Sequence, residues 1–195
     1  MLREMIMLMG GGVVTPVIKL LCLFDGNVDN SAVGSTAIIS PPTPYVYSGS
    51  LIRLSGSTIA CNFNFSFVNK ITASFTVPFT TYYFVYFDNV AYLELVTAAG
   101  AYGIHVHHQS YKELEVYLST PSGSVLVATV GDYTDHGLQT LTLECGVGGV
   151  KFTGFGVTYT QASPIIISPV TSAKIGGTLF SNAYFWADDF TVTVE

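Results

Sequence analysis

Apolar and polar residues alternate with a period of two along most of this chain, and this pattern constrains the fold more than any other feature. Phe63, Phe65 and Phe67 are separated by Asn and Ser, which places three aromatic rings on one face of an extended strand. Residues 71–77 alternate in the same way before Pro78, which we expect to end the strand because proline cannot donate to a ladder. No window has the period of an amphipathic helix, so the sequence predicts very little helix.

Turn-forming residues divide the chain into short apolar segments. Pro121-Ser-Gly123 is typical of a hairpin turn, Asp88-Asn89 predicts another turn, and glycines mark turns at 146–149 and 176–177. Strands are predicted between such turns, including residues 102–108, 111–118, 125–130, 138–144, 150–159, 164–168 and 185–194. Ten or more short strands at this spacing predict an all-β fold, an antiparallel two-sheet β-sandwich or jelly roll.

The front of the chain differs in composition from the rest. Residues 1–18 are apolar and rich in Gly and Met, and we expect a short N-terminal arm followed by a single domain at 19–195. No run of about 18 uninterrupted apolar residues occurs, which disfavours a membrane-spanning helix. Glu4 cancels the charge of Arg3 and no small-residue cleavage motif follows, so we do not expect a cleaved signal peptide.

Charged residues make up 10% of the sequence and hydrophobic residues 49%. Disordered and coiled-coil proteins need far more charge, so both classes are excluded. The net charge is −6 and the 7 Lys and Arg residues are scattered singly, so the chain lacks the basic face that nucleic-acid binding requires. A surface this poor in charge predicts that other subunits cover much of it, in a homo-oligomer or larger assembly, with the arm lying across a neighbour or adding a strand to it.

The three cysteines, Cys22, Cys61 and Cys145, lie far apart in the sequence. No Cys-x-x-Cys motif or Cys/His spacing indicates zinc, and an odd count leaves at least one thiol unpaired within the chain. We therefore expect buried structural thiols.

Three segments carry recognisable motifs in a fixed order. Residues 19–34 run through Phe24-Asp-Gly into an Asp-Asn-Ser turn, residues 45–57 contain Leu-Ile-Arg-Leu-Ser-Gly, and Ile-Gly-Gly at 175–177 precedes Phe-Trp-Ala-Asp-Asp-Phe at 185–190. Together they resemble laminin-G-like domains of the concanavalin A-like jelly-roll superfamily, although the usual Trp-His-His sequence before the late strand is absent. Such domains are common in bacteriophage tail, fibre and head-decoration proteins, so the resemblance implies a virion or extracellular location.

The last predicted strand contains three residues of interest. Trp186 is the only tryptophan, and we expect it to pack in the core rather than to stack on a sugar. Asp188 and Asp189 are predicted to point to opposite faces of the strand, one of them toward backbone amides at Asp25 and Gly26.

Glu113 and Glu115 share one face of a predicted strand. Glycosidases of the same superfamily place carboxylates at alternate positions, so that a nucleophile and an acid/base flank one bond. The next position on this face is Tyr117 instead of a third carboxylate, and we interpret the pair as surface residues.

His105, His107 and His108 form the densest titratable cluster. His105 and His107 share a strand face, and a carboxylate from the adjoining hairpin strand would complete a metal site, although exposed histidines on a sheet face are commoner. Calcium is a second option. Its oxygen ligands would come from Asp25, Asp29 and Asn30, or from Asp132 and Asp135, but neither loop has regular acidic spacing.

The sequence thus predicts no catalytic, cofactor-binding or metal-binding residues and no cofactor. The leading hypothesis is a non-enzymatic structural or adhesion module of an extracellular assembly, most notably a bacteriophage virion, that contacts other subunits and host-surface glycans. One alternative is a stand-alone lectin-like domain that stacks sugars on exposed tyrosines, namely Tyr45, Tyr47, Tyr82, Tyr83 and Tyr133. Another is a glycosidase that uses Glu113 and Glu115.

Overall fold

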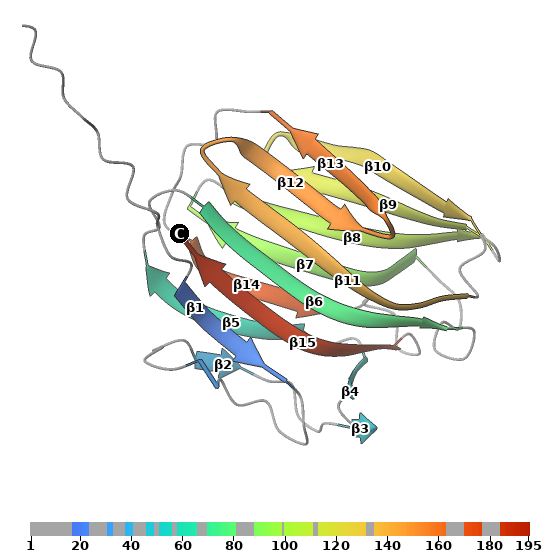
Figure 1. Cartoon of the computed structure of the whole chain (residues 1–195), viewed down its shortest axis with the longest axis horizontal. Helices are drawn as coiled ribbons and strands as arrows, with labels where there is room; N and C mark the ends of the chain where they lie inside the picture. The colour runs from blue at the N-terminus through green and yellow to red at the C-terminus, as the bar shows by residue number, and fades with distance from the viewer. Residues whose placement is uncertain are drawn as a thin grey trace, which may run out of the picture.

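The computed structural model describes residues 17–23, 31–32, 38–40, 46–48, 51–55, 58–65, 70–80, 88–98, 100–110, 113–131, 135–162, 170–176 and 184–195. The regular structure of these residues is all β, in two antiparallel sheets stacked face to face (Figure 1). The predicted antiparallel β-sandwich is confirmed. No helix of a length and hydropathy suited to crossing a membrane occurs within the described ranges.

The first sheet has eight strands. Its order is β13 (Val157–Gln161), β12 (Gly149–Gly154), β11 (Asp135–Gly146), β6 (Lys70–Thr80), β15 (Tyr184–Val194), β4 (Leu51–Ser55) and β3 (Val46–Ser48), with β1 (Val17–Cys22) also paired to β15. The second sheet has seven strands. Its order is β10 (Gly123–Gly131), β9 (Glu113–Thr120), β8 (Gly100–Ser110), β7 (Asp88–Thr97), β14 (Val170–Gly176), β5 (Thr58–Phe65) and β2 (Ile38–Ser40).

The core lies between the two sheets and is built by the alternating pattern. Phe75, Phe152 and Phe190 are its largest fully buried side chains on the first sheet, and Leu93 and Ile104 face them from the second. Burying side chains of this size is the main favourable contribution to folding. Cys22 and Cys145 are buried as predicted, and burial raises the pKa of the Cys145 thiol to about 12. The side chain of Cys61 lies outside the described part.

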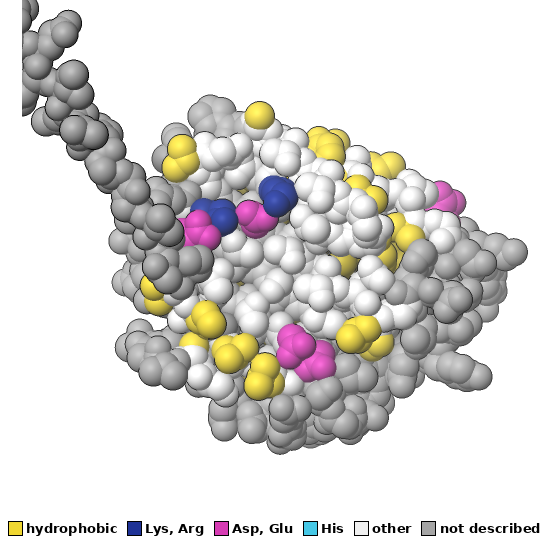
Figure 2. All heavy atoms as spheres, viewed as in Figure 1, with side chains coloured by type: hydrophobic (Ala, Val, Ile, Leu, Met, Phe, Trp, Pro, Cys, Tyr) yellow, Lys and Arg dark blue, Asp and Glu magenta, His cyan; other side chains and the backbone are white. Residues whose placement is uncertain are grey.

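The outer face of the first sheet is covered mainly by Ser and Thr. Their hydroxyls pair across strands: Ser74 Oγ lies 2.7 Å from Thr191 Oγ1, and Thr76 Oγ1 lies 3.2 Å from Thr140 Oγ1. Figure 2 shows this face, where uncharged polar atoms surround one group of Lys and Glu side chains near one end. This hydroxyl-rich surface accounts for the low charge without leaving the face apolar.

Pro78 does not end its strand as predicted, because β6 continues to Thr80 and Pro78 pairs with Leu138 of β11. The ladder between β6 and β15 reaches only to Thr76, so the missing proline N–H faces no strand on that side. Likewise, the turn predicted at Asp88 and Asn89 is wrong. Both residues begin β7 and pair with β8, next to a register shift that accommodates them.

Of the other predicted turns and strands, some are confirmed and some are not. The turns at 121–123 and 146–149 are confirmed, whereas the strand predicted at 150–159 is two strands, β12 and β13, separated by a turn at Phe155 and Gly156. Val17 and Ile18, assigned to the arm, belong to β1. Residues 1–16 and the predicted strand at 164–168 lie outside the described ranges.

Asp188 and Asp189 do not point to opposite faces. A bulge shifts the register of β15 between Asp188 and Thr191, with a positive φ of 48° at Asp189, whose backbone N–H donates to Asp188 Oδ1 at 2.9 Å. Ala187 and Phe190 are therefore both buried, and neither aspartate is buried between them. The loop at Asp25 and Gly26 lies outside the described residues, as does the side chain of Trp186.

Candidate functional site

The outer face of the second sheet carries a row of polar and aromatic side chains on three adjacent strands. On β8, Ile104 and Val106 are fully buried, so His105 and His107 point outward between them. On β9, the burial pattern alternates in the same way and turns Glu115 and Tyr117 outward. Glu94 of β7 adds a further carboxylate. We call these five residues, Glu94, His105, His107, Glu115 and Tyr117, the polar row.

Register brings the members of the polar row into contact. His105 pairs with Tyr117 across the β8–β9 ladder, and His107 pairs with Glu115. The rings of His107 and Tyr117 lie 4.9 Å apart at 59°, and the Tyr117 hydroxyl donates to Glu115 Oε2 at 2.8 Å. His105 Nε2 lies 3.7 Å from Glu94 Oε1 on the other side. The row thus offers carboxylate acceptors, imidazole groups and a tilted pair of rings on one face.

Gly103 makes room for the His105 imidazole. A Cβ at Gly103 would lie 3.1 Å from His105 Nε2 and 3.1 Å from the Leu93 carbonyl oxygen. The imidazole therefore lies against the backbone of its own strand, within reach of Glu94. No sequence motif indicates this glycine, because its role depends on the side chains packed around it.

The environment sets the protonation of two members of the row. Burial lowers the pKa of His105 below its ordinary value, a shift that Glu94 opposes and His107 adds to. His105 is therefore a neutral imidazole at neutral pH, with one donor and one acceptor nitrogen. The hydrogen bond to Glu115 raises the pKa of Tyr117, so its hydroxyl stays protonated.

The metal site considered for these histidines is not assembled by the described residues. No group of three His, Cys, Asp or Glu side chains among them is placed to hold an ion. Glu115 accepts from Tyr117, and Glu113 lies at the far end of the ladder, opposite Ser110. Glu113 and Glu115 do share the outward face of β9, as their spacing predicts.

The other sequence candidates cannot be placed in a site. Residues of the calcium and sugar-stacking hypotheses lie outside the described residues or have side chains outside them: Asp25, Asp29, Asn30, Asp132, Asp135, Tyr45, Tyr47, Tyr82, Tyr83 and Tyr133. The side chain of His108, the third member of the histidine cluster, also lies outside the described part.

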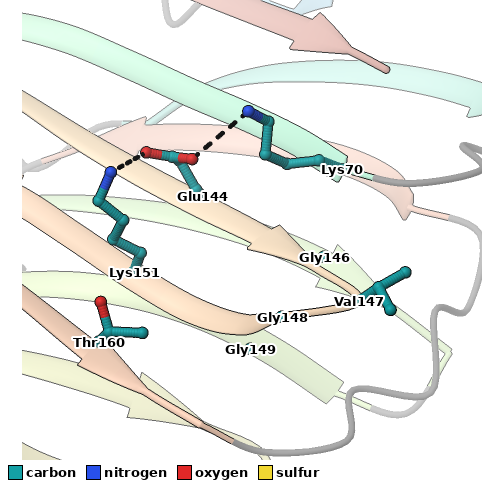
Figure 3. Close-up of a pocket in the computed structure, with 8 residues that line it drawn as sticks. All are labelled: Lys70, Glu144, Gly146, Val147, Gly148, Gly149, Lys151 and Thr160. Atoms are coloured by element: carbon teal, nitrogen blue, oxygen red, sulfur yellow. Dashed lines mark hydrogen bonds and ion pairs between the residues drawn. The ribbon is translucent and has the colours of Figure 1, made fainter. Parts of the chain in front are cut away.

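A second polar site lies on the other sheet, in a hollow of about 220 Å³ (Figure 3). Glu144 of β11 binds two ammonium groups there, Lys151 Nζ at 2.8 Å and Lys70 Nζ at 3.6 Å. Lys70 also pairs with Glu195 at 3.0 Å, and this hydrogen bond is the main cause of its raised pKa. Two cations and two carboxylates neutralise one another here, so the hollow does not present the excess positive charge of an anion site.

The comparisons with known proteins show the fold and not the family. No family model matches the chain, and no curated protein matches it. Among solved structures, the receptor-binding domain of botulinum neurotoxin mosaic serotype C/D has a TM-score of 0.61 and 13% identity. The match covers 90% of this chain and 47% of that one, so this chain spans about half the length of the toxin domain.

Two other matches cover nearly the whole of both chains. Domain 4 of AbnA, an extracellular arabinanase from Geobacillus stearothermophilus, solved with arabinotriose, has a TM-score of 0.54 and 12% identity, covering 93% of this chain and 94% of that one. The CBM2 module of the evolved Dit of Lactobacillus casei BL23 phage J-1 has a TM-score of 0.54 and 10% identity, covering 93% and 97%. The chain thus shares its two-sheet β-sandwich fold with these domains, consistent with a jelly roll.

Proposed function

We propose that this chain is a carbohydrate-binding, lectin-like module that serves adhesion in a larger extracellular assembly, and that the polar row is its saccharide site. The observation that carries the proposal is the contact between His107, Tyr117 and Glu115. It places a tilted pair of rings beside a carboxylate acceptor on the partly exposed outer face of the second sheet. Aromatic faces stack on the apolar faces of sugars, and carboxylates with neutral imidazoles bind sugar hydroxyls.

The pKa of Tyr117 and the partners of Glu115 and His105 favour binding over catalysis in the polar row. The raised pKa of Tyr117 keeps its phenol protonated, so it is a poor base. Glu115 accepts the Tyr117 hydrogen bond, and His105 is held by burial and by Glu94 rather than placed beside a nucleophile. These pairings hold each group in a fixed orientation for a ligand, which lowers the entropy lost on binding.

The assembly we propose is a bacteriophage virion, in which the domain lies in a tail, fibre or head-decoration protein. Two observations support this context: the similarity in fold to a module of a phage Dit protein, and a first-sheet face of paired hydroxyls with few charges, suited to contact with other subunits. Mass spectrometry of purified particles from the source tests it. The chain is expected among the particle proteins, and its absence from intact particles would oppose this context.

A glycan array followed by calorimetry tests the saccharide site, with and without calcium. Against the best array ligand, His107→Ala and Tyr117→Ala should each weaken binding about tenfold, the loss expected for one good contact. Thr142→Ala, on the outer face of the other sheet, is the matched control and should bind like the wild type. Binding to no saccharide, or equal affinity in all four proteins, would contradict the proposal.

A further inference from the structure

The edge strand β10 has a composition that edge strands usually avoid. Its nine residues, Gly-Ser-Val-Leu-Val-Ala-Thr-Val-Gly, contain no charge and no proline, and no described strand pairs with its outer side. Folded proteins normally shield such an edge with Lys, Pro, a short strand or a covering loop, because its open N–H and C=O groups are a template for pairing. Bulges also discourage pairing, and the one between Leu126 and Ala128 is the only protective feature of this kind in β10.

The other described edges are shorter or are shielded. β2 and β3 have three residues each, and β13 has five. β1 carries Lys19, and the backbone N–H of Ser31 donates to the Leu21 carbonyl. β10 is therefore the longest edge that the described part of the chain leaves open.

Apolar side chains are exposed on both faces of β10. Val125 lies opposite the fully buried Leu118 and faces the space between the sheets, yet it is 38% exposed. Leu126 lies opposite Tyr117 on the outer face and is 44% exposed. Figure 2 shows hydrophobic side chains at the upper margin of the molecule, where β13 and β10 lie in Figure 1. One more strand beside β10 would cover both residues.

The two sheets also part at this edge. A hollow of about 220 Å³ lies between the β9–β10 hairpin and the end of β13, lined by Thr120, Ser122, Gly123, Ser124, Val125 and Gln161. Among the described residues, Gln161 Oε1 is buried there with no hydrogen-bond partner, a state that costs free energy until a donor reaches it. This hollow is a second observation, independent of the backbone, that the described part of the chain does not complete this edge.

We propose that β10 pairs antiparallel with β10 of a second copy of this chain, joining the seven-stranded sheets of two subunits into one continuous sheet. A two-fold axis perpendicular to the sheet sets a strand antiparallel to its copy, so the contact is self-complementary. Neither strand carries a charge to oppose it. Glu113 and Glu115, the acidic residues of the neighbouring strand β9, lie one strand further in. Beyond about 8 Å, repulsion between the two negative chains is screened at physiological salt.

This pairing has a consequence for the proposed saccharide site but does not depend on it. A two-fold axis perpendicular to the shared sheet places the outer faces of both subunits on the same side. Two polar rows would then face one surface, and a surface with many glycans would be bound with higher avidity. The dimer is tested without any saccharide, so its failure and that of the saccharide site are distinguishable.

The test is the mass of the full chain in solution, by light scattering coupled to size exclusion. The wild type should have twice the chain mass of 20.9 kDa. Leu126→Lys, which places an ammonium group on the shared edge, should have the mass of one chain. Leu138→Lys makes the same change at an exposed leucine away from this edge, 63% exposed on β11, and should remain dimeric.

Hydrogen exchange provides a second readout that does not rely on a variant. In the wild type, amides of β10 should be protected at high concentration and exchange faster on dilution, whereas those of the interior strand β6 should not change. A wild-type monomer at every concentration, a dimer unaffected by Leu126→Lys, or equal loss of the dimer in Leu138→Lys would each overturn the proposal.

Discussion

The Tyr117 hydroxyl donates a 2.8 Å hydrogen bond to Glu115 Oε2, two positions earlier on the same strand. In a strand these two side chains share a face, so the contact arises within β9 and needs no distant element. The hydrogen bond fixes the Tyr117 ring, which lies against the His107 ring, and it occupies one oxygen of the Glu115 carboxylate. Together these three groups form the centre of the polar row.

We expect Glu115→Gln to lower the pKa of Tyr117. The hydrogen bond to Glu115 is the largest cause of the raised value, because a phenolate beside a carboxylate would lose this bond and meet a like charge. The pKa can be followed by NMR of labelled tyrosine rings, with Tyr117→Phe to assign the signal. Glu113→Gln is the matched control and should leave the Tyr117 signal unchanged. A pKa that does not respond to loss of Glu115 would show that the contact does not form in solution.

Acidification should destabilise the fold through His105. Its pKa in the folded state is lowered, chiefly by burial, so between that value and about 6.5 the unfolded chain binds more protons than the folded one. The contribution of His105 to stability is therefore greatest above pH 6.5 and is lost as the pH falls through this range. Denaturant unfolding at pH 7.5 and 5.5 should show a smaller acid loss in His105→Gln. An equal loss in both proteins would contradict this assignment.

Gly149→Ala should destabilise the protein by about 1–3 kcal/mol, the usual cost of a strained backbone position. Gly149 has a φ of +116°, and an added Cβ would collide with the backbone carbonyl oxygen of Gln161 on β13. Gly148, in the same turn, has open space around it, so Gly148→Ala should change the free energy of unfolding by less than about 0.5 kcal/mol. Chemical denaturation of the two variants gives the comparison, and equal stabilities would rule out this role for Gly149.

Phe75→Ala should cost about 3–5 kcal/mol, because it removes a large side chain from a close-packed core. Phe75 is fully buried in β6, a central strand of the first sheet. Leu138→Ala on the neighbouring strand β11, where the side chain is 63% exposed, should have little effect. Melting temperatures and denaturant midpoints measure both changes. A small effect at Phe75 would mean that the two sheets are not packed as described.

Local pattern was enough to predict the fold class and which side chains of the polar row share a face, although the sequence alone assigned no site to them. The alternation in residues 102–118 places His105, His107, Glu115 and Tyr117 on one face, and a hairpin between neighbouring strands brings them together. The incorrect predictions of a strand end at Pro78 and of a turn at Asp88 have a common cause. Local turn and breaker preferences were outweighed by pairing with a strand that the sequence alone does not identify.

Contacts between distant strands were beyond sequence reasoning for the same reason. Lys70 meets Glu144 because β6 pairs with β11, 74 positions away in sequence. The bulge at Asp188 and Asp189 is set by the need to bury both Ala187 and Phe190, and no local motif marks it. Registers of this kind depend on packing across the whole sandwich.

An NMR titration with the saccharide selected on the array tests the central claim most directly. Resonances of His105, His107 and Tyr117 should shift together and saturate with one affinity, while those of Lys70 and Lys151 in the hollow of the other sheet stay unchanged. Shifts confined to the lysines, or no saturable shift in the polar row with any saccharide, would contradict the account.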